Sequence, residues 1–171
     1  MTSLIDQAIA IFTDNGIQFT RVHEDCVQAT FEAAHASHEV FVETHGTVLG
    51  IYIYPPAKIP NHSLSRITEY ITRINYGLRL GHFELDFEEG ILRFAHNMDL
   101  EGSRITTPML LNALYFGLSV LDDYHPGLMR IVFSGISAKK ACDEIKFRHR
   151  EDVIENREAG VSKRPMDRLR H

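Results

Sequence analysis

Residues 75–94 read NYGLRLGHFELDFEEGILRF, and this stretch decides the fold. Gly77 is placed to end a helix, because glycine takes the left-handed conformation after a helix at no steric cost. Phe83 and Leu85 then alternate with acidic residues, which is the period of a strand with one buried face. Glu88-Glu89-Gly90 is a turn, and a second alternating run follows it. The stretch therefore predicts a helix followed by an antiparallel hairpin.

The chain before this stretch predicts a helix, four strands and a second helix. Ser3 can cap the first helix, which ends at Asn15-Gly16. Four short runs of alternating apolar residues lie between residues 17 and 53, and tight turns join them into an antiparallel meander with one buried face. Pro55-Pro56 stops the sheet. The second helix carries a buried stripe made by Leu64, Ile67, Ile71, Ile74 and Leu78.

The chain after the stretch predicts two further helices. Thr107-Pro108 opens one of them, with the threonine as cap and the proline at the first helical position, and Pro126-Gly127 interrupts it. Leu128 to Ser134 fits either a continued helix or a short strand, since periodicity does not decide. Gly135-Ile136-Ser137 is a break with a new cap that leads into a helix at Ala138 to Ile145. The order α-β-β-β-β-α-β-β-α-α predicts an α+β fold, an antiparallel sheet with helices packed on it.

Two segments resemble the YbjN family of bacterial proteins. Residues 75–94 are similar to its pattern N…LPLG-x-F-x-L-D…G-x-V-R-F, and Tyr124 to Gly135 is similar to its Y-x-P-x-L-x-x-V-x-x-G ending. Ser137 to Ala141 stands where the family has S-P-E-E-A, without the proline and the acidic pair. The resemblance covers the chain from Leu4 to Ile145. The resemblance implies a fold like that of type III secretion chaperones, which are small acidic dimers that bind extended segments of client proteins. It also implies a function as a regulator of sensory transduction.

Composition and charge describe one globular domain. Apolar residues make up 44% and charged residues 24% of the 171 residues. Residues 146–171 carry a net charge of +3, against −8 for the rest. We therefore expect a YbjN-like α+β domain at 1–145 and a charged C-terminal extension at 146–171, partly helical and then disordered. Two cysteines give neither a disulfide framework nor a zinc site, and without a leader or a membrane-spanning run we expect a cytoplasmic protein.

The third helix is too apolar to bury only one face. On a helical wheel from Met109 to Asp123 its apolar arc spans roughly 220°, whereas one buried face needs about 100°. One side can cover the sheet, and the other needs a second layer. A partner subunit in a homodimer can supply that layer, or the chain's own segment from Leu128 to Ile145 can. The stripe predicted as a candidate protein interface is made by Met109, Ala113, Phe116 and Val120.

Residues suited to catalysis or metal binding are few. The best metal candidate is the group His35, His38 and His45, but the first two lie in a turn and not one helical turn apart. Asp122-Asp123 point about 100° apart on a helix, which predicts a solvated face and not a catalytic pair. His125 is placed as a helix-end residue. No catalytic, cofactor-binding or metal-binding residue is therefore predicted.

The leading interpretation is a non-enzymatic protein-binding module, chaperone-like or a regulatory adaptor, which acts as a homodimer on an unidentified protein client. It rests on the acidic body, the wide apolar helix, the exposed strand edges and the family resemblance. One alternative is a small metal-dependent hydrolase that uses His35, His38 and His45. Another is a weak binder of anionic ligands through a basic tail that contains Lys163-Arg164. No cofactor, nucleic acid or membrane is expected as a partner.

Overall fold

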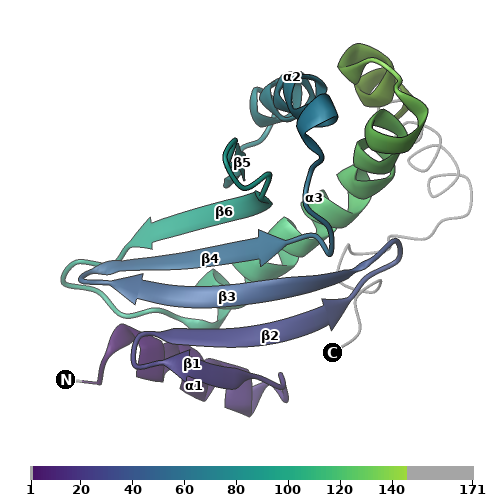
Figure 1. Ribbon diagram of the computed structural model, residues 1–171. Coiled ribbons are helices and arrows are strands. Elements are labelled where there is room, and N and C mark those ends of the chain that lie inside the picture. The colour runs from purple at the N-terminus through teal and green to yellow at the C-terminus, as the bar shows by residue number, and fades with distance from the viewer. Residues whose placement is uncertain (1, 146–171) are drawn as a thin grey trace, which may run out of the picture.

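The protein is built on one six-stranded sheet, and the computed structural model describes residues 2–145 (Figure 1). All neighbouring strands are antiparallel, and their order across the sheet is β1-β2-β3-β4-β6-β5. The strands are β1 (Thr20–His23), β2 (Cys26–Glu32), β3 (Ser37–His45), β4 (Val48–Tyr54), β5 (His82–Leu85) and β6 (Leu92–Asp99). The helices are α1 (Leu4–Asp14), the short 3-10 helix η1 (Asn61–Ser63), α2 (Leu64–Asn75) and α3 (Thr107–Ser134), and residues 138–145 are also helical.

Helices cover only one face of the sheet. α1 packs on β2 and β3, and α3 packs on β4 and β6 and passes behind the strands in Figure 1. This covered face buries every second residue of β2, β3 and β4, and Val42, Ile51 and Phe94 are fully buried there. α2 packs on β5 and on α3. No helix of residues 2–145 lies on the opposite face, so the alternate strand residues there meet solvent.

The first helix and strand follow from local signals. The Ser3 hydroxyl accepts a hydrogen bond from the backbone N–H of Asp6 at 3.2 Å and caps α1, as predicted. The first strand begins at Thr20 and not at Ile17, where the alternating pattern starts. The backbone N–H of Ile17 donates to the carbonyl of Phe12 at 2.9 Å, so residues 17–19 are still tied to the end of the helix.

α3 is one helix of 28 residues, and the predicted interruption at Pro126-Gly127 is wrong. A proline inside a helix removes one backbone hydrogen bond, but packing on both sides offsets that loss. His125, Leu128 and Ile131 are buried around it. A Cβ at Gly127 would clash with the hydroxyl of Tyr70 in α2. The glycine is therefore present for the close approach of two helices and not as a helix stop.

The ends of α3 fall close to the predicted positions. Its cap is Thr106, one residue before the predicted Thr107, and the Thr106 hydroxyl accepts a backbone N–H at 3.4 Å. Leu128 to Ser134, which periodicity left open, continues the helix. Ser137 then caps the helical residues 138–145 by accepting a backbone N–H at 3.2 Å, as predicted.

The α+β class, the antiparallel sheet and the order of elements are confirmed. The division between a domain at 1–145 and a C-terminal extension at 146–171 stays a prediction, because the extension lies outside the described residues. Among residues 2–145, no helix combines the length and the apolar character needed to cross a membrane.

Candidate protein-interaction surface

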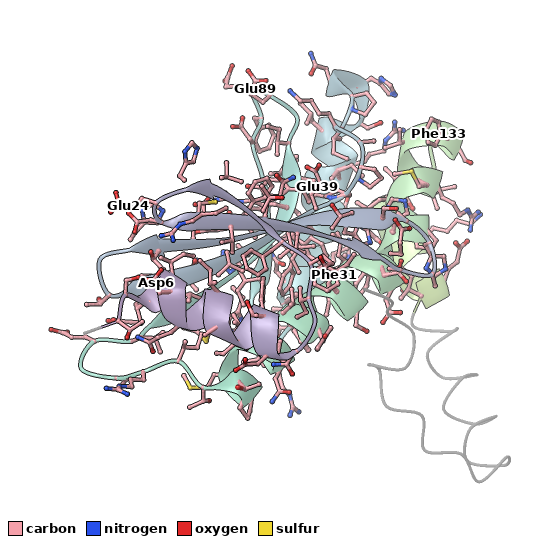
Figure 2. All side chains as sticks on the ribbon, turned by 90° about the horizontal axis from the view of Figure 1, so that it is seen from below. Asp6, Glu24, Phe31, Glu39, Glu89 and Phe133 are labelled. Carbon is pink, nitrogen blue, oxygen red and sulfur yellow. The ribbon has the colours of Figure 1, made fainter. Side chains whose placement is uncertain are left out.

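The open face is the side of the sheet opposite α1 and α3. The strand register brings Glu39, Phe41 and Glu43 of β3 to this face, with Tyr54 opposite Glu39 and Tyr52 opposite Phe41 on β4. Figure 2 shows Glu39 on the other side of the strands from α1. A stripe of aromatic and acidic side chains therefore crosses the middle of the sheet.

Three aromatic rings and one arginine form the centre of the open face. The rings of Phe41 and Tyr54 meet edge to face with their centroids 5.5 Å apart. The Arg93 guanidinium lies over the ring of Tyr52, 4.3 Å from its centroid, and donates a hydrogen bond to the Tyr54 hydroxyl at 3.2 Å. All four side chains are half-buried. They therefore present apolar and aromatic surface to solvent while they are held in place by one another.

The carboxylates of this face differ in whether an arginine of the chain neutralises them. Arg93 Nε donates to Glu84 Oε2 at 2.5 Å, and His82 Nε2 lies 2.9 Å from the other oxygen. Burial raises the pKa of Glu84, but Arg93 and His82 outweigh it and hold the pKa below its ordinary value. Glu39 and Glu43, in contrast, lie within ion-pair distance of no lysine or arginine of residues 2–145. Net negative charge therefore remains on the β3 side of the open face.

Gly50 fixes the orientation of Tyr52. A Cβ at Gly50 would lie 2.7 Å from the Tyr52 ring and hydroxyl and 2.8 Å from Asn97 Oδ1. The Tyr52 hydroxyl donates to that same Asn97 oxygen at 3.0 Å. The tyrosine thus occupies the space that a side chain at position 50 would take, and its ring lies along the sheet with Arg93 stacked on it.

Two hollows adjoin the aromatic cluster. Their volumes are about 360 Å³ and about 380 Å³, and Tyr54 and Ile91 line both. The first also includes Glu39, Phe41 and Glu43, together with residues 55–58 of the link after β4. The two hollows therefore meet at Tyr54 and Ile91 on the open face.

The one thiol at this surface is not activated. Cys26 Sγ lies 3.7 Å from Glu43 Oε1. Burial of the thiol, followed by the charge of Glu43, raises the pKa of Cys26 to about 11. Because the thiolate is the nucleophile, this arrangement keeps Cys26 protonated and unreactive at neutral pH.

The predicted interface stripe on α3 is only partly accessible. Ala113 and Val120 are buried, whereas Met109 is 38% exposed and Phe116 is half-buried with its ring 6.3 Å from that of Phe94. α1, α2 and the helical residues 138–145 contact α3, so the chain itself supplies much of the second layer. Met109 and Phe116 are therefore the two residues of the stripe whose side chains a partner could contact.

The three histidines of the predicted metal group are not brought together. His35 lies in the turn before β3, His38 at the start of β3 and His45 at its end, so His38 and His45 are separated by about 23 Å along the strand. His45 is exposed and lies 3.5 Å from Glu43. Within residues 2–145, no group of three or more His, Cys, Asp or Glu side chains could hold a metal ion. The geometry gives no support to a hydrolase built on these histidines.

Asp122 binds the turn between β2 and β3, a role that the sequence did not reveal. Its carboxylate accepts the backbone N–H of Ala34 at 3.2 Å and that of His35 at 2.8 Å, and the His35 imidazole lies 3.1 Å away. The fully buried His38 lies 3.7 Å from Asp122 Oδ1. Asp122 is only 7% exposed, so the predicted solvated face is wrong at this position. The wheel shows where a residue sits on a helix, but not which turn crosses it.

The charge state of this buried group is set by its neighbours. Burial raises the pKa of Asp122, but the imidazoles of His38 and His35 and the backbone of His35 lower it to about 2. His125 lies in the middle of α3 and not at a helix end as predicted, with its ring 5.9 Å from that of His38. Burial and then His38 lower the pKa of His125. An Asp122 anion that accepts two backbone N–H groups and lies beside these imidazoles therefore fastens the β2–β3 turn to α3.

These observations define a class of protein. It is an α+β protein whose antiparallel sheet is covered by helices on one face and carries an aromatic, acidic surface on the other. The features that define this class lie in the fold, since the buried Asp122 fastens a turn and the Cys26 thiol is held protonated.

The chain belongs to the YbjN family, whose description is "Putative bacterial sensory transduction regulator", and the match covers residues 5–129. The family expected from the two sequence segments is thereby confirmed. The fold is similar to that in the crystal structure of YbjN from E. coli, described as a putative transcription regulator. The TM-score is 0.52 at 6% sequence identity, covering 69% of this chain and 85% of that one, so the likeness concerns the fold alone. No match was found among curated proteins.

Proposed function

We propose that the chain is a non-enzymatic regulatory module that acts by binding another protein through the open face of its sheet. The observation that carries this proposal is the half-buried cluster of Phe41, Tyr52 and Tyr54. Tyrosine and phenylalanine are enriched at protein interfaces, because they bury much area at little cost in side-chain entropy. The core does not require these three rings, since other residues of the same strands fill it.

A regulatory role fits the description of the family as a regulator of sensory transduction. The same proposal accounts for the lack of an activated nucleophile at this face, where the raised pKa of Cys26 disfavours thiolate chemistry. Neither Cys26 nor Cys142 forms a disulfide, which fits the reducing conditions of a cytoplasm. A chaperone-like adaptor for one client is the form of the function that we favour.

Self-association is part of the proposal. Met109 and Phe116 are the accessible members of the apolar stripe on α3, and they lie on the other side of the sheet from the open face. A twofold contact between two such stripes would leave both open faces free for a client. The module would then be a homodimer with two equivalent binding faces.

Site-specific crosslinking tests both parts. A photoreactive phenylalanine analogue is placed at position 41 on the open face, at position 109 on α3, or at position 133. Phe133 is 81% exposed at the end of α3 and serves as the matched control. After irradiation in source cells, we expect a defined heteromeric adduct from position 41 and an adduct of twice the chain mass from position 109.

The control decides whether these adducts are specific. Position 133 is expected to give neither of them, because exposure alone does not make an interface. An identical set of adducts from positions 41 and 133, or none from position 41, would count against binding through the open face. No double-mass adduct from position 109 would remove the stripe from the proposed dimer.

A further inference from the structure

The open face carries negative charge that its own residues do not neutralise. Glu39 and Glu43 stand on either side of Phe41 on the same face of β3. Their polar neighbours are the Gln28 amide, 3.4 Å from Glu39, and the Cys26 thiol and the exposed His45 imidazole, 3.7 Å and 3.5 Å from Glu43. None of these is a lysine or an arginine, and the one arginine in the cluster is already paired with a third carboxylate. Two carboxylates beside an aromatic ring are therefore available to a partner.

The effect of this charge extends to Tyr52. Burial raises the pKa of Tyr52, and the carboxylates of Glu43 and Glu84 raise it further, against the opposing influence of Arg93. Burial is the largest of these causes, and Arg93 is the largest charge effect. Glu43 and Glu84 therefore act on the centre of the open face as negative charges that oppose Arg93.

The same rings already hold a cation. The guanidinium of Arg93 is stacked on Tyr52 at 4.3 Å, the arrangement by which aromatic faces attract arginine and lysine. A lysine or arginine from a partner can lay its aliphatic stem on Phe41 while its charged end reaches Glu39 or Glu43. The open face thus offers both things that a long basic side chain needs, an apolar support and a carboxylate.

The spacing of the carboxylates indicates the conformation of the ligand. Glu39 and Glu43 are four residues apart on an extended strand, which is about 13 Å. A partner segment in the same extended conformation would place two basic side chains opposite them if those side chains are also four residues apart. The residue midway between the two would then face Phe41, where an apolar side chain fits.

We infer that the open face binds an extended protein segment with lysine or arginine at positions i and i+4 and an apolar residue at i+2. This inference rests on the proposed function and names the chemistry of the client. The two carboxylates would repel nucleic acid and anionic membranes. They also disfavour a second copy of this chain at the same face, because a twofold contact would bring like charges together.

A synthetic peptide tests the inference directly. The probe is fluorescein-labelled Lys-Ser-Leu-Ser-Lys-Ser-Leu-Ser-Lys, and its binding to the full chain is followed by fluorescence anisotropy. We expect the double variant Glu39→Gln/Glu43→Gln to bind about five- to tenfold more weakly at low salt. The matched control is Asp14→Asn/Glu101→Gln, which removes the same charge from two exposed positions elsewhere and is expected to leave affinity unchanged.

Two further peptides separate register from charge. A peptide of the same composition with the lysines made adjacent is expected to bind more weakly, and one with glutamate in place of lysine is expected not to bind. Equal losses in the two double variants, or equal binding of the two lysine peptides, would show attraction by net charge alone and overturn the inference. A chain mass that falls from dimer to monomer on Phe41→Ser would assign the face to a second copy and would overturn it as well.

The inference and the proposed function fail differently. If none of the peptides binds but position 41 still crosslinks to a defined protein, the basic chemistry is wrong and the binding function stands. If position 41 gives no adduct and no peptide binds, both are wrong.

Discussion

The two faces of the sheet are made from alternate residues of the same strands, and they follow opposite rules. On the covered face, Val42 and Ile51 are fully buried beneath the helices. On the open face, their strand neighbours Phe41 and Tyr52 remain half-buried, held by ring contacts and one arginine. Large aromatic side chains in that position add little to the core, and their exposed area is available for contacts outside the chain.

Acidic residues on the two sides of the sheet show the same contrast. Asp122, on the covered side, is buried and receives two backbone N–H groups and a histidine. Glu39 and Glu43, on the open face, pair with no lysine or arginine of residues 2–145, and only the exposed His45 lies near Glu43, at 3.5 Å. Both kinds of carboxylate carry the same charge. A structural carboxylate differs from one available for recognition in having its hydrogen-bonding capacity filled by the chain itself.

The largest expected effect comes from truncating one aromatic residue on each face. Phe94→Ala on the covered face should lower the free energy of unfolding by about 3–5 kcal/mol, because Phe94 is fully buried and its loss leaves a cavity. Phe41→Ala on the open face should cost about 1 kcal/mol, mainly its edge-to-face contact with Tyr54. Urea unfolding followed by circular dichroism measures both. Similar losses would mean that the open face is covered in solution.

A smaller effect is expected when the buried carboxylate is neutralised. Asp122→Asn should destabilise the fold by about 2–3 kcal/mol at pH 7, because it disturbs the bonds to the β2–β3 turn. The folded pKa of about 2 lies below the ordinary 3.8, so the stabilisation by the anion is complete above pH 3.8 and is lost as the pH falls toward 2.

The stability difference between the wild type and Asp122→Asn should therefore narrow in that acid range. The midpoints of urea unfolding of both proteins at pH 7, 4 and 3 measure this difference. The matched change on the open face, Glu43→Gln, should shift stability by less than about 0.5 kcal/mol at any of these pH values. A difference for Asp122→Asn that does not change with pH would show that the anion is not the stabilising species.

The smallest expected effect is the difference in stability loss between alanine substitutions at two glycines, Gly117 and Gly50. A Cβ at Gly117 of α3 would lie 2.7 Å from Ile53 and 2.8 Å from Phe94, both in the core. Gly117→Ala should cost about 1–2 kcal/mol, since overpacking exceeds the gain in helix propensity. Gly50→Ala on the open face should change stability by less than about 0.5 kcal/mol, because Tyr52 can turn toward solvent, yet it should weaken the peptide binding described above. Thermal unfolding distinguishes the pair, and equal losses would contradict the contrast between the faces.

Much of the fold could be predicted because its signals are local. Ser3 caps a helix through the N–H of a residue three positions on, and the turn before Leu92 is closed by Asp86, whose carboxylate accepts the N–H groups of Glu88 and Glu89, and by Gly90 with its positive φ. The predicted helix interruption at Pro126-Gly127 is wrong because the same dipeptide that ends many helices also permits close packing of two helices. Only the position of Tyr70, which is far away in sequence, shows which of the two applies.

Part of the candidate surface could be predicted from the sequence. Alternation shows that Glu39 and Glu43 point away from Val40 and Val42, and that part needs only a period of two. That Tyr52 lies opposite Phe41, and that Arg93 stacks on it, depends on the register of β3, β4 and β6, which no single strand encodes. For the same reason, the contact between Asp122 and the β2–β3 turn could not be read from either segment alone.

The bond from Asp122 to the backbone of His35 also has a meaning for folding kinetics. It joins residues 87 positions apart in the chain. A contact that closes so long a loop gains nothing until the strands and α3 are both in place, since the entropy of closure must be met first. We therefore expect this contact to form late in folding. Its loss should then speed unfolding more than it slows folding.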